Sequence, residues 1–79
     1  MDYNTDKVDD AVLALHYLTR CGDRYGERSW KGQDWNALER LYEKGYIGDP
    51  KSKAKSVPLT EEGLARSEEL FRKLFGKGD

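Results

Sequence analysis

The sequence predicts one domain that is mainly α-helical with a small β-hairpin, in the order helix, loop, helix, strand, strand, helix. Three observations predict this class. Apolar residues recur at three- and four-residue steps in three separate stretches. Glycines stand where these stretches end, and a lysine-rich turn sequence separates the last two. A chain of 79 residues holds one small hydrophobic core, so we expect residues 1–79 to form a single domain.

The first helix is expected over about residues 5–21. Asn4 or Thr5 can cap it, and acidic residues occupy its opening turns, where the helix dipole favours them. One buried stripe is expected along this helix, formed by Val8, Ala11, Val12, Leu15 and Leu18. His16 lies beside the stripe without Cys, Asp or Glu placed to complete a metal or catalytic set, so we expect a structural or surface histidine.

Residues 22–33, GDRYGERSWKGQ, carry three glycines and no apolar periodicity, which predicts a loop. A short turn, or a strand around residues 28–30, is the alternative. We expect Tyr25 and Trp30 to fold back on the core. The competing interpretation is that these aromatic rings stack on bases while neighbouring basic side chains grip phosphates.

The second helix is expected over about residues 34–44, with Trp35, Leu38, Leu41 and Tyr42 on its inner face. Gly45 is expected to end it in the left-handed conformation.

A hairpin is predicted over about residues 46–59, where Lys51, Lys53 and Lys55 alternate with small residues. Pro58 cannot donate to a ladder, so its strand should be short or at an edge. Thr60 then caps a third helix over about residues 61–75.

The pattern LERLYEKGYI followed by VPLTEEGLARSEEL resembles winged-helix transcription regulators of the multiple-antibiotic-resistance and phenolic-acid-repressor (MarR/PadR) type. This resemblance implies a winged-helix-like fold, with the second helix in the recognition position and residues 46–59 as the wing. Two features depart from the pattern: the 22–33 loop replaces a bracing helix, and Glu39 and Glu43 place acid on the recognition face. The whole chain also resembles a small bacterial family of uncharacterised domains.

Composition restricts the function classes. The net charge is −1, with an excess of basic residues only over 20–55. The single cysteine, Cys21, and the single histidine supply neither a disulfide nor a ligand cluster. We therefore expect a non-enzymatic domain with no cofactor and no metal. The sequence has no stretch typical of a signal peptide or membrane span, so we expect a cytoplasmic protein that does not bind membranes.

Two hypotheses for function follow. The first is a regulator that binds double-stranded DNA, with phosphate contacts from Lys51, Lys53, Lys55, Arg24, Arg28 and Lys31 and base contacts from Asn36 and Arg40. The second is a protein-interaction module or small homodimer that binds no nucleic acid, with a contact surface formed by Tyr25, Trp30, Tyr46 and Phe75.

Overall fold

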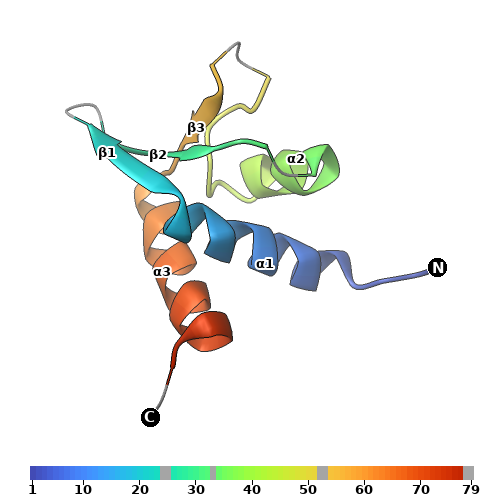
Figure 1. The fold of residues 1–79 in the computed structure, drawn as a ribbon. Helices are drawn as coiled ribbons and strands as arrows, with labels where there is room; N and C mark the ends of the chain where they lie inside the picture. Colours follow the sequence, from blue (N-terminus) through green and yellow to red (C-terminus); the bar gives the residue numbers. More distant parts are fainter. Residues whose placement is uncertain (24–25, 33, 52–53, 78–79) are drawn as a thin grey trace.

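The protein folds as three helices and a three-stranded antiparallel sheet, in the order α-β-β-α-β-α (Figure 1). The structure is a computed structural model that describes residues 1–23, 26–32, 34–51 and 54–77. The chain is therefore mixed α and β, and its arrangement is not clearly that of a winged helix. Tyr25, Arg24 and Lys53, which the sequence analysis singled out, lie outside the described residues.

Helix α1 spans Thr5–Leu18, and the side chain of Asn4 caps it by accepting from the Lys7 N–H at 3.1 Å. It ends about three residues earlier than predicted because the chain enters strand β1 at Arg20. The predicted buried stripe is only partly right: Val12 is buried, whereas Leu18 is 61% exposed because α1 ends there. The buried side of α1 is completed instead by Leu13 and Ala14.

The predicted loop over residues 22–33 is wrong for most of its length. Strands β1, Arg20–Asp23, and β2, Gly26–Trp30, form an antiparallel hairpin in which Cys21 lies opposite Arg28. The sequence hides these strands because their buried side carries no apolar residue. Ser29 is the buried position on β2, and its hydroxyl donates to the carbonyl of His16 in α1.

Helix α2 spans Trp35–Glu43, within one residue of the predicted limits. Gly45 follows with φ of 82°, which confirms the predicted left-handed position. The predicted inner face is only half right: Leu38 and Leu41 are buried, whereas Trp35 and Tyr42 are exposed. The third buried residue on this helix is Ala37.

The predicted hairpin over residues 46–59 closes only at its base, where Ile47 and Leu59 form an isolated bridge. Strand β3, Ser56–Pro58, pairs with β2 instead of forming a separate two-stranded wing. The reason is local, because Val57 turns into the core while the backbone of β3 completes the sheet beside β2. The strand that holds Pro58 is short, as expected.

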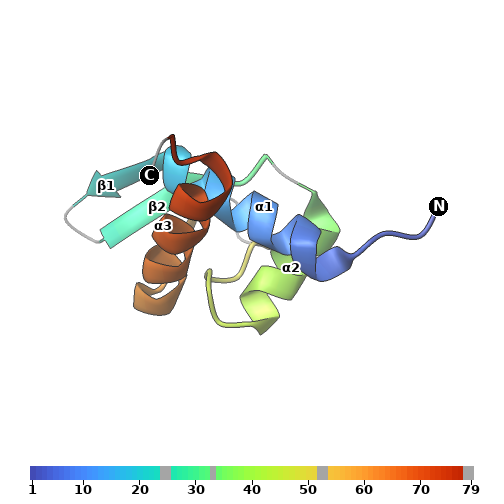
Figure 2. The ribbon, with the colours of Figure 1, turned by 90° about the horizontal axis from the view of Figure 1, so that it is seen from below.

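Helix α3 spans Glu61–Phe75, as predicted, and Thr60 caps it through a 2.9 Å bond from the Gly63 N–H. Helices α1 and α3 pack together below the sheet, and α2 lies against α1 (Figures 1 and 2). Among the described residues, nine buried apolar side chains join these layers: Val12, Leu13, Ala14, Ala37, Leu38, Leu41, Ile47, Val57 and Leu70.

Candidate functional site

Arg40, predicted to contact bases, belongs instead to an ion cluster between α1 and α2. Its guanidinium lies 2.8 Å from the carboxylate of Asp9, which is fully buried. Lys44 binds the same carboxylate at 3.0 Å and reaches Asp6 at 3.3 Å. Burial raises the pKa of Asp9, but the hydrogen bonds from Arg40 and Lys44 outweigh it, so the pKa is lowered below the ordinary 3.8. The side chain of Arg40 is therefore committed to holding two helices together.

Two of the other predicted DNA contacts that the structure describes use their charged groups within the protein. Arg28 donates to the hydroxyl and the carbonyl of Ser56 at 2.8 and 2.9 Å, and Lys31 donates to the carbonyl of Pro50 at 2.9 Å. Lys51 and Lys55 are exposed, but the Lys51 ammonium lies 4.0 Å from the Glu39 carboxylate on α2.

The outward side of α2 also carries acidic side chains. Asn36, the remaining predicted base contact, is exposed there, together with Glu43. A helix that enters a DNA groove meets phosphate on both sides, so this charge opposes the recognition role that the resemblance implied.

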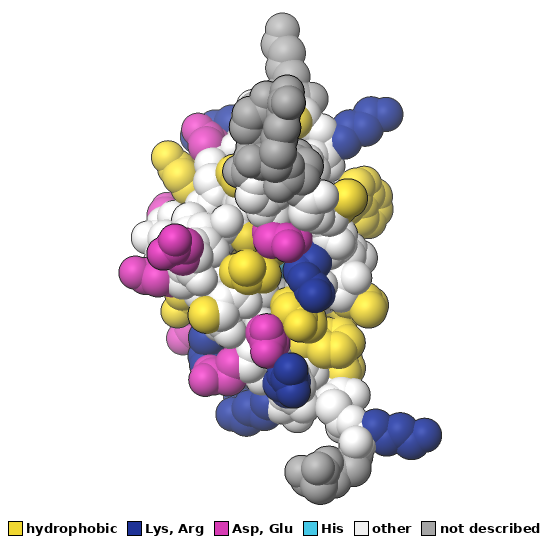
Figure 3. Space-filling view, turned by 90° about the vertical axis from the view of Figure 1, so that its left-hand side faces the viewer, with side chains coloured by type: hydrophobic (Ala, Val, Ile, Leu, Met, Phe, Trp, Pro, Cys, Tyr) yellow, Lys and Arg dark blue, Asp and Glu magenta, His cyan; other side chains and the backbone are white. Residues whose placement is uncertain are grey.

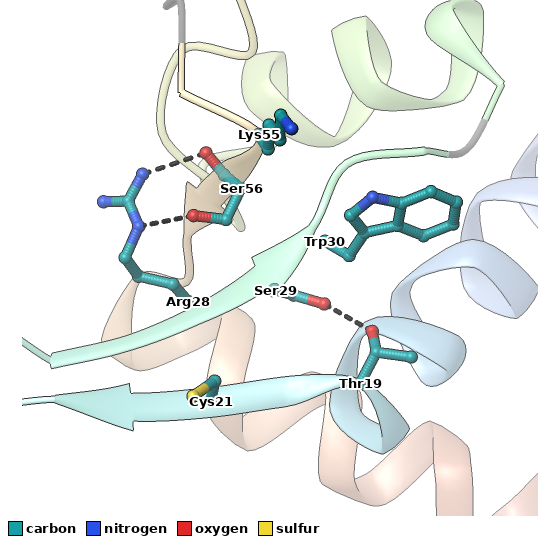
Figure 4. Close-up of a pocket in the computed structure, with 7 residues that line it drawn as sticks. All are labelled: Thr19, Cys21, Arg28, Ser29, Trp30, Lys55 and Ser56. Atoms are coloured by element: carbon teal, nitrogen blue, oxygen red, sulfur yellow. Dashed lines mark hydrogen bonds between the residues drawn. The ribbon is translucent and has the colours of Figure 1, made fainter.

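A groove opens on the face of the sheet that points away from α1 and α3. It has a volume of about 370 Å³ and is lined by Thr19, Cys21, Arg28, Ser29, Trp30, Lys55 and Ser56. Figure 4 shows the indole of Trp30 on one side of the groove and Arg28 with Ser56 on the other. This volume fits one large side chain together with its flanking backbone.

Trp30 does not fold back on the core as expected, since 57% of it is exposed. Its ring covers Gly32, where an added Cβ would lie 2.1 Å from the ring atoms. A glycine at position 32 is thus needed for the indole to lie flat on the backbone. The result is a large, pre-positioned aromatic surface facing solvent, which is typical of a binding anchor.

A second apolar area lies along the contact between α1 and α3. The rings of Tyr17, Phe71 and Phe75 stack in sequence, with centroids 5.5 and 5.4 Å apart. Phe75 is 50% exposed, and Leu18 and Leu74 are also exposed. Figure 3 shows hydrophobic side chains gathered between charged ones on this side of the molecule.

The predicted protein-contact residues thus divide. Trp30 and Phe75 are exposed on different surfaces, whereas Tyr46 packs partly buried against the core. Sequence reasoning missed the exposure of Trp35, which is 52% exposed. The spacing of the apolar residues could have indicated this exposure. On a nine-residue helix, Ala37, Leu38 and Leu41 are enough to form the inner face.

His16 is buried in the core, and neither ring nitrogen has a hydrogen-bond partner among the described residues. Burial lowers its pKa from 6.5 to about 4. This agrees with the structural role expected from the sequence. Among the residues that the structure describes, no group of three or more His, Cys, Asp or Glu is placed to hold a metal ion.

We expect this histidine to make the fold acid-sensitive. Between pH 6.5 and 4 the unfolded chain binds a proton at His16 that the folded chain does not. The free energy of unfolding should therefore fall with decreasing pH, by about 2 kcal/mol at pH 5. The lowered pKa of Asp9 makes a further contribution to the free energy of unfolding, and this contribution is lost only below about pH 3.8. Urea unfolding at pH 7, 6 and 5 measures the slope.

The control is His16→Leu, which keeps an apolar volume without a titrating group. Its free energy of unfolding should be nearly flat between pH 6.5 and 5. An equal slope in both proteins would show that His16 is not its source.

In the described parts of the chain, no helix is long and apolar enough to cross a membrane. The family model described as "Domain of unknown function (DUF6429)" matches residues 4–77. The chain is 56% identical over 75 residues to "Uncharacterized protein y4hR" of Sinorhizobium fredii, which covers 95% of this chain and 97% of that protein. No solved structure matches the chain. Because the family model and the relative both span nearly all of the sequence, the chain belongs to the DUF6429 family.

Proposed function

We propose that this protein is a non-catalytic protein-binding domain whose main anchor is Trp30 on the open face of the sheet. One observation carries the proposal: a tryptophan that is 57% exposed stands fixed over Gly32 at the wall of a groove. Exposed tryptophans in pre-positioned pockets are enriched among the residues that dominate protein–protein binding.

The charges around the groove indicate what it binds. Lys55 is exposed at the rim, and Arg28 is fixed against β3 by its two bonds to Ser56. Both cations line the groove, and no acidic side chain does so among the residues that the structure describes. A partner segment with a large apolar side chain beside Asp or Glu would match this surface, because the ring buries the apolar group and the rim attracts the carboxylate.

A displayed library of random peptides, selected on the purified protein, tests this function. We expect enriched peptides to carry a large apolar residue next to an acidic one. Their binding should fall at least about 10-fold in Trp30→Ala. The matched control is Trp35→Ala, which removes an indole of similar exposure away from the groove and should leave binding unchanged. Failure to enrich any peptide, or equal binding to both variants, would contradict the proposal.

DNA binding is the second candidate, and one observation favours it. Lys51 and Lys55 are exposed on the segment that the winged-helix resemblance assigns to the wing. Titration of labelled duplex DNA at two salt concentrations separates the two functions, since phosphate contacts make affinity fall steeply with salt. If Lys51→Glu with Lys55→Glu abolishes a salt-sensitive affinity, DNA is the partner. If the duplex binds neither protein, this candidate is excluded.

A further inference from the structure

Strand β1 leaves one edge of the sheet open, and the hydrogen bonds of β2 show which atoms face outward. The Lys31 N–H donates to the carbonyl of Lys55, and the Leu59 N–H donates to that of Glu27. The backbone N–H and C=O groups of the odd-numbered residues of β2 therefore point toward β3. Those of Arg28 point toward β1, where they form backbone hydrogen bonds with Cys21, the residue opposite in the register. Alternation then directs the N–H and C=O groups of Arg20 and Gly22 away from the sheet.

The opposite edge of the sheet is already closed. The Gly48 N–H donates to the carbonyl of Pro58 at 2.9 Å, and Ile47 pairs with Leu59. No backbone bond beyond the β1–β2 ladder involves Arg20 or Gly22 within the described residues. A row of outward backbone donors and acceptors is a template for another strand.

This edge is complementary to itself. Two antiparallel copies of β1 form bonds only where outward residues oppose each other. If Arg20 of each copy pairs with Gly22 of the other, two hydrogen-bonded pairs form and Cys21 lies on the two-fold axis. Pairing Arg20 with Arg20 would set like charges opposite each other, which is unfavourable. The Cys21-centred register is therefore the one that uses both outward residues without opposing like charges.

A partly buried carboxylate also favours a second copy over an unrelated strand. Glu27 lies opposite Gly22 in the register, and a Cβ at Gly22 would be 2.9 Å from the Glu27 carboxylate. The Glu27 Oε2 atom is buried and has no hydrogen-bond partner in the described structure. In the self-paired register, Arg20 of the second copy lies beside Gly22 on the same sheet face. Its guanidinium donates to the Tyr17 carbonyl of its own copy at 2.8 Å and lies over that ring, so it exchanges these contacts to reach the Glu27 oxygen.

The apolar area beside α3 extends the contact. Strand β1 follows directly on the C-terminal end of α1, whereas the C-terminal end of α3 points away from the sheet (Figure 1). Leu18, at the end of α1 next to β1, is exposed, and so is Phe75, which joins Tyr17 of α1 through Phe71. Backbone bonds between two four-residue strands bury little area, so a stable dimer needs such an apolar surface beside them.

We propose that the protein forms a homodimer in which two β1 strands pair antiparallel about a two-fold axis at Cys21. The two sheets then join into one of six strands, and Arg20 of each copy binds Glu27 of the other. This dimer goes beyond the peptide-binding function and uses the edge of β1 rather than Trp30, so either proposal can fail without the other.

Charge exchange under reducing conditions tests the dimer. Sedimentation equilibrium of the wild type should show a dimer. Arg20→Glu and Glu27→Arg should each raise the dissociation constant at least about 10-fold. The double variant should restore the dimer, because the charges are then exchanged and attract again. Circular dichroism establishes that each variant is folded, and Trp30→Ala should dimerise as the wild type does.

Cross-linking tests the register. Cys21 is the only cysteine, and a non-hydrogen-bonded antiparallel pair holds Cα atoms about 4.5 Å apart, which a disulfide can span. Diamide accepts the two electrons and two protons of the two thiols, so a Cys21–Cys21 dimer should form readily and should be absent in Cys21→Ser. A wild-type monomer at up to about 1 mM would overturn the proposal. A dimer that neither cross-links nor responds to the charge exchange would overturn it as well.

Discussion

Gly63→Ala is expected to destabilise the protein by about 3 kcal/mol or more, because there is no room for a methyl group at this position. A Cβ on Gly63 would lie 1.8 Å from the carbonyl oxygen of Tyr46. That carbonyl also accepts the Thr60 N–H at 3.1 Å, so it cannot yield without opening the start of α3. Helix propensity alone predicts the opposite sign, since Ala in a helix is favoured over Gly by about 1 kcal/mol.

Urea unfolding followed by circular dichroism measures this effect. The control is Gly45→Ala, where no atom lies within 4 Å of the added Cβ and only the positive φ is penalised. It should lose about 1–2 kcal/mol. A Gly63→Ala protein as stable as the wild type would show that α3 does not pack against the Tyr46 backbone as described.

Asp9→Asn is expected to cost about 2 kcal/mol, and Arg40→Met is expected to cost more. The order follows from burial. Loss of the carboxylate frees Arg40 and Lys44, which are partly exposed and can turn to solvent. Loss of Arg40 leaves a fully buried charge at Asp9 with Lys44 alone. The double variant should therefore be more stable than Arg40→Met, because the uncompensated carboxylate is gone.

Unfolding of the four proteins in a double-mutant cycle gives the coupling between Asp9 and Arg40. Glu39→Gln is the control, since Glu39 forms an exposed 4.0 Å pair with Lys51, and this change should alter stability by less than about 1 kcal/mol. If Arg40→Met behaves like this control, Arg40 is available for an external partner and its assignment to the core is wrong.

The helices could be predicted from sequence because their signals are local. Asn4 and Thr60 cap through atoms three residues away, and the apolar steps on α1 and α3 repeat within one element. The same reasoning located Gly45. Such patterns require no knowledge of the rest of the fold.

The hairpin and the ion cluster could not be predicted, because both depend on partners far away in the chain. Asp9 and Arg40 are 31 positions apart, so nothing near Arg40 indicates that its charge is used. Strand β2 buries Ser29 against the α1 backbone instead of an apolar side chain, which removes the alternation that marks a strand. The groove at Trp30 exists only because β3 pairs with β2, and the paired residues are 26 or more positions apart in the sequence.

Protein binding at the open sheet face is tested most directly by calorimetric titration of one selected peptide into the wild type, Trp30→Ala and Trp35→Ala. The predicted result is an affinity at least about 10-fold weaker for Trp30→Ala, with wild-type affinity for Trp35→Ala. Equal affinity for the wild type and Trp30→Ala would contradict the assignment of this surface.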